Sequence, residues 1–139
     1  MFKIMFLCTG NSCRSQMAEG FARELGKGLI AAYSAGLSPQ GVNPKAVAVM
    51  KEIGIDISKQ QSKAIDAELL EKMDMVITLC DNASESCPWT PPAIKRIHWS
   101  LKDPAHVEGP EEEVLNEFRR VRDEIKEKIV DFLKEISNT

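Results

Sequence analysis

The sequence lacks the features that would direct it to a membrane or to nucleic acid. No apolar run approaches the ~20 residues of a membrane-spanning helix. The apolar stretch in MFKIMFLC is too short for a signal peptide and lacks a small-residue cleavage site. No long basic run occurs, and the formal net charge is −3. We therefore expect a cytoplasmic chain that binds neither membranes nor nucleic acid.

Histidine is scarce, and the cysteines lack the spacing of a metal site. No C-x-x-C pair occurs, and neither His98 nor His106 belongs to a ligand-spaced pair. This pattern disfavours a structural zinc site, and we expect no cofactor. A chain of this length closes a core without disulfides, so its cysteines are catalytic, metal-binding or inert. The cysteines are Cys8, Cys13, Cys80 and Cys87.

Short apolar segments alternate with helical patterns along the whole chain. The apolar runs, typical of buried strands, cover residues 3–8, 29–36, 75–80 and 93–99. Helical patterns cover residues 15–26, 43–54 and 66–72, and a long amphipathic pattern begins at about Pro110. No repeat or linker divides the chain. We expect one α/β domain over residues 1–139, three layers deep, with a four-stranded parallel sheet and helices on both faces.

Three reactive side chains follow predicted strands. Cys8 ends the first strand, Cys80 ends the third, and Asp103 follows the fourth by a few residues. Ligands of an open parallel sheet bind outside the carboxyl ends of its strands. The sequence therefore predicts a functional site at this edge, where these three side chains meet.

The segment CTGNSCRS has the composition of an oxyanion cradle. It lies between a predicted strand and a predicted helix, where a turn directs backbone N–H groups to the positive end of the helix dipole. Arg14 adds a planar guanidinium for two oxygens of a tetrahedral anion, and the positive surroundings favour the thiolate of Cys8. Such a site suits covalent attack on a phosphate-like centre. We expect the anion to be held by Cys8, Thr9, Gly10, Asn11, Ser12, Cys13, Arg14 and Ser15.

A purely structural interpretation of this loop is the alternative. Cys8 would then be a buried strand-end cysteine and Arg14 a surface charge, since C-x5-R occurs often by chance. The strand before the loop, the glycine within it and the helix after it favour a functional role. No separate chemistry for Cys13 follows from the sequence, and we expect it to support the loop.

Several motifs resemble a known family. CTGNSCRS resembles the phosphate-binding loop of the low-molecular-weight protein tyrosine phosphatases, and DPA at 103–105 resembles their Asp-Pro motif. CTGNSCRSQMAEG, YSAG, GIDIS, TLC, CP…PP and DPA are closer to the arsenate reductases coupled to thioredoxin, which share this fold. The resemblance runs over essentially the full length of the chain.

The resemblance implies roles for five residues. Cys8 would be the nucleophile, Arg14 the oxyanion clamp and Asp103 the general acid. Cys80 would attack Cys8 and release arsenite, and Cys87 would then attack Cys80 and leave a disulfide for thioredoxin to reduce. We expect a monomer that acts in arsenic detoxification, with arsenate as substrate and thioredoxin as partner.

Two features favour reduction over hydrolysis. Ala105 follows the Asp-Pro motif where phosphatases usually carry an aromatic residue, and Tyr33 is the single tyrosine of the chain. Cys80 has no part in ester hydrolysis, whereas a thiol beside a thiolate–oxyanion adduct permits transfer of an electron pair. The alternatives are a phosphatase, for which the loop alone would support weak activity, and an oxyanion-binding or redox-sensing module without turnover.

The spacing of Cys80 and Cys87 predicts a conformational change. In one regular helix they would lie roughly 10 Å apart along the axis, whereas a disulfide tolerates only about 4.4–6.8 Å between Cα atoms. We therefore expect the reduced and oxidised forms to differ mainly in residues 80–92.

Some of these reductases hold a potassium ion. Asn11, Glu19 and Ser34 match polar positions of that site, but Lys63 stands where a carboxylate usually lies. The Lys63 ammonium would either replace the metal or face solvent.

Overall fold

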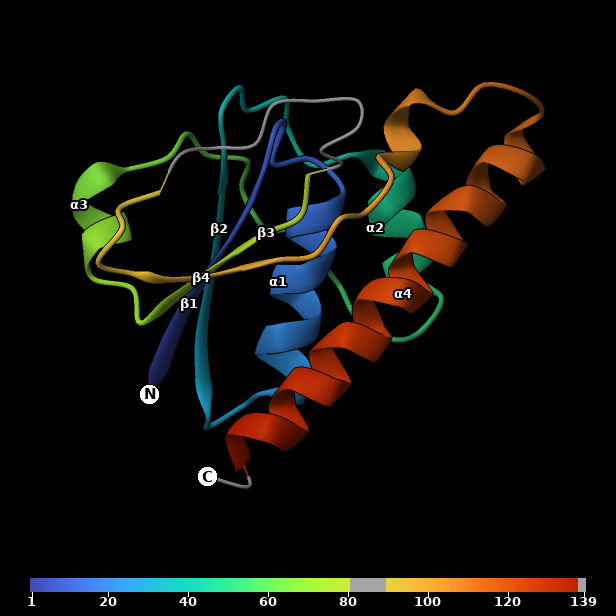
Figure 1. Cartoon of the computed structure of the whole chain (residues 1–139). Helices are drawn as coiled ribbons and strands as arrows, with labels where there is room; N and C mark the ends of the chain where they lie inside the picture. Colours follow the sequence, from blue (N-terminus) through green and yellow to red (C-terminus); the bar gives the residue numbers. More distant parts are fainter. Residues whose placement is uncertain (81–89, 138–139) are drawn as a thin grey trace.

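The structure is a computed structural model that describes residues 1–80 and 90–137. Strands and helices alternate along this part of the chain, as the sequence predicts (Figure 1). The elements are β1 (Phe2–Cys8), α1 (Arg14–Leu25), β2 (Ile30–Gly36), α2 (Pro44–Lys51), α3 (Ala67–Glu71), β3 (Met75–Thr78), β4 (Lys95–His98), the 3-10 helix η1 (Pro104–His106) and α4 (Glu111–Ser137).

The strands form one parallel sheet in the order β2-β1-β3-β4. β1 lies between β2 and β3, and its last residue, Cys8, pairs with Gly36 at the end of β2. Because all four strands run in the same direction, their carboxyl ends meet at one edge of the sheet, at the top of Figure 1. The predicted parallel sheet is confirmed.

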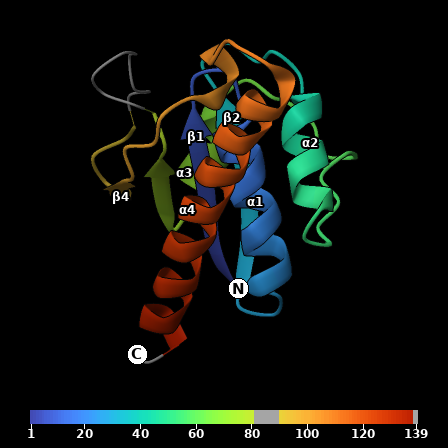
Figure 2. The same cartoon turned by 90° about the vertical axis from the view of Figure 1, so that its right-hand side faces the viewer.

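Helices cover both faces of the sheet, and alternate residues of β1 face the two layers (Figures 1 and 2). Ile4 and Phe6 belong to the core under α1, α2 and α4. Met5 and Leu7 belong to a second cluster with Leu70 of α3. Because each face of β1 is buried from Ile4 onward, the strand is apolar from Ile4 to Cys8 rather than alternating. The predicted three-layer α/β architecture is confirmed.

The predicted end of β3 at Cys80 is wrong by two residues. The strand ends at Thr78. The Leu79 N–H still donates to the carbonyl of Leu7 in β1. The Leu79 carbonyl instead accepts a hydrogen bond from the side chain of Arg14, so the ladder stops there. β4 is likewise shorter than the predicted 93–99.

Local capping sets the bounds of α2. Asn43 is its N-cap and accepts a hydrogen bond from the Lys45 N–H at 2.8 Å, as its residue type favours. The helix ends at Lys51, and Gly54, predicted to lie past its end, turns the chain back with φ +83°. The Ile55 N–H then bonds to the Met50 carbonyl, which is the closure typical of a glycine-terminated helix.

The long helix α4 packs its apolar stripe against the rest of the core. The stripe predicted from the sequence is buried, and a charged residue, Arg122, is buried with it. No helix in the two described ranges is long and apolar enough to cross a membrane. The buried apolar residues of α4 are Val114, Phe118, Val121, Ile125, Ile129 and Phe132.

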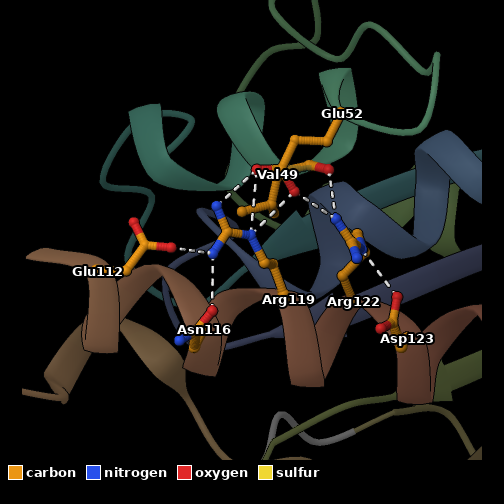
Figure 3. Close-up of polar contacts among 7 residues, drawn as sticks. All are labelled: Val49, Glu52, Glu112, Asn116, Arg119, Arg122 and Asp123. Atoms are coloured by element: carbon orange, nitrogen blue, oxygen red, sulfur yellow. Dashed lines mark hydrogen bonds and ion pairs between the residues drawn. The ribbon is translucent and has the colours of Figure 1, made fainter.

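A polar network joins α4 to the end of α2 (Figure 3). Arg122 Nη1 donates to the Val49 carbonyl at 2.9 Å and to Glu52 Oε1 at 2.8 Å. Arg119 donates to the same carboxylate through Nε and Nη2, and this hydrogen bonding lowers the pKa of Glu52. Val49 lies in the last turn of α2, where carbonyl groups lack partners within the helix, so Arg122 caps that end.

Candidate active site

The thiol of Cys8 lies at the end of β1, at the carboxyl edge of the sheet. Its sulfur is 2.9 Å from the hydroxyl oxygen of Ser15 in the first turn of α1. Ser15 accepts a hydrogen bond from Asn11 Nδ2 at 2.7 Å, which leaves the hydroxyl hydrogen available to point at the sulfur. A hydroxyl that donates to sulfur stabilises the thiolate, which is the nucleophilic form of cysteine.

The loop from β1 to α1 has its carbonyl groups bonded on its outer side. The carbonyls of residues 9–13 accept hydrogen bonds of 2.9–3.1 Å from Ser38 N, Gln40 N, Gln16 Nε2, Asn43 N and Met17 N, in that order. A trans peptide places each carbonyl opposite the N–H of the next residue. The N–H groups of residues 10–14 are therefore directed to the inner side, where they form an anion-binding nest.

Two residues permit the tight course of this loop. Asn11 has φ +45°, in the left-handed region that asparagine tolerates better than most residues, and its Oδ1 accepts from the Lys63 N–H at 2.8 Å. Gly36 lies against the loop, and a Cβ there would be 2.8 Å from both Asn11 N and the Thr9 carbonyl oxygen. β2 approaches the loop this closely because residue 36 has no side chain.

Arg14 is only 2% exposed, so the alternative of a surface charge is excluded. Its Nη1 donates to the carbonyls of Leu79 at 3.2 Å and Leu101 at 3.1 Å. Its Nη2 lies 3.5 Å from Asp103 Oδ2. Segments that follow β3 and β4 therefore hold the guanidinium at the cavity, where it can bind an oxyanion as a fixed fork.

Asp103 reaches the same site, as the sequence predicts. It is the N-cap of η1, and its Oδ1 accepts from the Ala105 N–H at 3.0 Å. Its Oδ2 faces Arg14 Nη2 and also lies 3.3 Å from His106 Nε2. The carboxyl is 21% exposed, so a substrate in the cavity can reach it.

These side chains surround a cavity of about 220 Å³. Six of the eight residues predicted to hold an anion line it, whereas Asn11 and Ser15 bond to each other behind the loop. No Phe, Tyr or Trp is among the described residues of the lining. The cavity is therefore a small polar pocket over a thiol. Its lining is Cys8, Thr9, Gly10, Ser12, Cys13, Arg14, Gln40, Gly41, Val42, Asn43, Pro44, Asp103, Ala105 and His106.

Cys13 differs from Cys8 in its surroundings, although both line the cavity. Burial, with the negative charge of Asp103 as a second cause, raises the pKa of Cys13 to about 12. Cys13 is therefore a neutral thiol at physiological pH and a poor nucleophile. This agrees with the supporting role expected for it.

The comparison with known proteins agrees with this geometry. Residues 3–139 match the low molecular weight phosphotyrosine protein phosphatases. The chain belongs to this family.

Its relatives within the family include arsenate reductases. The chain is 54% identical to the arsenate reductase of Bacillus subtilis (strain 168) and 57% identical to that of Halalkalibacterium halodurans, in each case over 93% of both chains. A solved arsenate reductase in the phosphate binding state is 42% identical, with a TM-score of 0.79 over 98% of this chain and 99% of that one. The resemblance to arsenate reductases of the phosphatase fold is confirmed.

Cys80 lies next to the family's anion site rather than inside the cavity. It is fully buried and directly follows Leu79, whose carbonyl anchors Arg14. Cys8 and Cys13 are free thiols. Cys87 lies outside the described residues, as does most of the segment 80–92 for which we expect a redox-dependent change.

The residues expected around a potassium ion are engaged in other bonds. The buried Glu19 carboxylate accepts from Ser34 Oγ and from Arg23 Nη2, both at 2.6 Å. Arg23 already supplies the positive charge that a cation would bring, so these residues as arranged do not fit potassium. The Lys63 side chain is exposed to solvent. Within residues 1–80 and 90–137, no group of three or more His, Cys, Asp or Glu is placed to hold a metal ion.

The sequence analysis missed residues 40–44, which line the cavity beside the loop and bond to its carbonyls through Gln40 N and Asn43 N. Residues 40–44 follow β2 at the carboxyl edge, so the rule that places Cys8 at the site also points to them. His106, weighed only as a metal ligand, enters the lining because η1 carries it over Asp103. The sequence signal that could have placed His106 at the site was its position two residues after Pro104 of the Asp-Pro motif.

Proposed function

We propose that this chain reduces arsenate to arsenite, with Cys8 as the nucleophile and thioredoxin as the final reductant. The observation that carries the proposal is the position of Cys80, a second sulfur directly after the residue that anchors Arg14. Hydrolysis requires no such sulfur. The arsenate reductases among the relatives support the same reaction.

In the first step, the Cys8 sulfur attacks the arsenic of a bound arsenate. The N–H groups of residues 10–14 and the Arg14 guanidinium stabilise the oxyanion charge. Asp103 protonates one oxygen, which departs as water while the sulfur–arsenic bond forms. The anchored position of Arg14 supports this step, because the clamp does not reorganise when the anion enters.

In the second step, the Cys80 thiolate attacks the Cys8 sulfur. The sulfur–arsenic bond breaks, its electron pair moves to arsenic, and arsenite leaves. The enzyme keeps a Cys8–Cys80 disulfide, so two electrons have passed from the two thiolates to arsenic. Cys87 then attacks Cys80 and frees Cys8, and thioredoxin reduces the Cys80–Cys87 disulfide.

A phosphatase acting on small phosphoesters is the second candidate. Family membership favours it, and the same nest and guanidinium suit phosphate as well as arsenate. The cavity opposes a preference for aryl esters, because its described lining contains no Phe, Tyr or Trp side chain to form the wall of a ring pocket. We therefore expect phosphatase activity to be a side reaction of the Cys8 cradle.

The variant Cys80→Ser separates the two candidates. We expect it to lose multiple-turnover arsenate reduction, followed as NADPH consumption with thioredoxin and thioredoxin reductase, because no thiol remains to take arsenite off Cys8. Its hydrolysis of para-nitrophenyl phosphate should persist, because that reaction uses the Cys8 cradle alone. Cys8→Ser is the control and should lose both reactions.

Three outcomes would contradict the proposal. Arsenate reduction by Cys80→Ser would rule out the relay. NADPH consumption that arsenate does not stimulate in the unmodified chain would rule out reduction and leave the phosphatase. Arsenate-dependent oxidation that stops after one equivalent, despite excess thioredoxin, would identify a sensor without turnover.

A further inference from the structure

We propose that His106 supplies the proton that Asp103 delivers to the departing oxygen, an inference that rests on the proposed function. His106 Nε2 lies 3.3 Å from Asp103 Oδ2. The His106 side chain is 84% exposed, and that of Asp103 is 21% exposed. The imidazole therefore contacts bulk water on one side and the carboxyl group on the other.

An aspartate that acts as a general acid needs a proton in every turnover. A carboxyl group is ordinarily ionised at neutral pH, whereas an imidazole ordinarily exchanges its proton near neutral pH. Arg14, the other charged group at Oδ2, keeps its protons at any such pH and cannot supply one. Of the two groups that contact Oδ2, His106 is the one able to pass a proton.

The turn fixes the geometry of the pair. Asp103 Oδ1 accepts from the Ala105 N–H, which orients the carboxyl so that Oδ2 faces Arg14 and His106. Pro104, with its restricted backbone, is the first residue of η1, and one turn of this helix carries His106 back over Asp103. Ala105 and His106 also line the cavity, so the proton path runs along its rim.

The proposed steps balance in protons and move no electrons. The Asp103 carboxylate first takes the Nε2 proton of the His106 imidazolium. Asp103 Oδ2 then passes this proton to a hydroxyl oxygen of hydrogen arsenate, which leaves as water when the Cys8 sulfur bonds to arsenic. The neutral imidazole regains a proton from water or buffer. His106 acts through Asp103 and does not touch the substrate, so it is a positioning and relay residue.

Formation of arsenite in a single turnover by the reduced full chain tests the relay without thioredoxin recycling. We expect His106→Ala to slow this step at least about tenfold, and by no more than the ~10²–10⁴-fold that a general acid contributes. His106→Gln keeps a hydrogen-bond donor for Oδ2 but cannot carry a proton, and it should be as slow. Glu108→Gln, an exposed charge change nearby, is the matched control and should keep the unmodified rate.

Added imidazole distinguishes a relay from a merely structural contact. The rate of His106→Ala should rise with the imidazole concentration, because free imidazolium can protonate the Asp103 carboxylate. Imidazole should not accelerate the double variant Asp103→Asn/His106→Ala, because that variant has no carboxylate at position 103 to protonate. An unmodified rate in His106→Gln, or equal acceleration of the single and double variants, would overturn the inference.

A measurement without turnover tests the contact itself. The ring nitrogen signals of His106 in ¹⁵N spectra should shift in Asp103→Asn, whereas those of His98, bonded to Thr78, should stay. Unmoved His106 signals would overturn the inference even if arsenate is reduced. An unmodified chain that forms no arsenite would instead contradict the proposed function, and the spectra would still decide whether the pair exists.

Discussion

The fully buried amide of Gln16 braces the anion-binding loop from behind. Its Nε2 donates to the carbonyls of Asn11 and Gln61, both at 3.0 Å, and its Oε1 accepts from Gln60 Nε2 at 2.8 Å. The bond to Asn11 turns the next N–H, that of Ser12, toward the cavity. At the scale of single residues, anion binding therefore depends on a side chain that does not line the cavity.

The isosteric variant Gln16→Glu replaces this donor with an acceptor opposite the carbonyls of Asn11 and Gln61, the first of which is buried. We expect its free energy of unfolding in urea to fall by about 2–3 kcal/mol. KM for arsenate should rise more than kcat falls, because the nest is displaced while Cys8 remains. Gln60→Ala is the control, since it leaves both donations of Gln16 intact and should cost less. Equal losses of stability and equal KM values in the two variants would contradict this role.

At the scale of elements, α4 stabilises the helix that forms one wall of the site. α2 begins at Asn43 and Pro44 in the cavity wall, and its other end is capped by Arg122 of α4 (Figure 3). Sequence patterns predict both helices but not this bond, because it joins Val49 to a residue 73 positions away. The buried Arg122 is the exception in an otherwise apolar stripe.

Arg122→Met keeps a long apolar side chain but leaves the Val49 carbonyl and Glu52 without this donor. We expect the free energy of unfolding to fall by about 1–3 kcal/mol, as for other unsatisfied buried groups. The control Arg120→Ala removes ion pairs on the exposed side of α4 and should cost less than ~1 kcal/mol. Urea titration of both variants measures the difference, and equal losses would show that Arg122 does not cap α2.

At the scale of the whole molecule, the cavity is assembled from three separate segments. The loop after β1, the segment 40–44 and residues 103–106 meet only in the folded chain. An anion bound among them has no comparable site in the unfolded chain, so binding stabilises the fold as a whole.

Inorganic phosphate should therefore raise the temperature of global unfolding. At about 100 times its Kd, a ligand of the native state adds about 2.7 kcal/mol of stability. The shift should exceed that in potassium chloride of equal ionic strength, because chloride cannot bridge the nest and the guanidinium. Arg14→Lys should lose most of the shift, since an ammonium lacks the planar fork. Calorimetric traces that match in phosphate and chloride would contradict the assembled site.

The sequence alone determined the order of the elements and the place of the loop CTGNSCRS at the carboxyl edge of the sheet. Continuous apolar runs predict strands buried on both faces, and Asn43 with Pro44 predicts a helix start, because these preferences act over a few neighbouring residues. The parallel sheet then places Cys8 and Asp103 at one edge. Local preference could not place the end of β3, because the Arg14 side chain takes the carbonyl that would continue the ladder.

Only the tertiary structure decided how the site is built around Cys8. It buried Arg14 on carbonyls 65 and 87 residues away, placed residues 40–44 beside the loop, and set His106 on Asp103. Each of these contacts joins segments whose separation along the chain carries no information about their distance in space. Local physics therefore predicts CTGNSCRS to be an anion loop, whereas long-range packing sets Arg14, residues 40–44 and Asp103 around the Cys8 thiol.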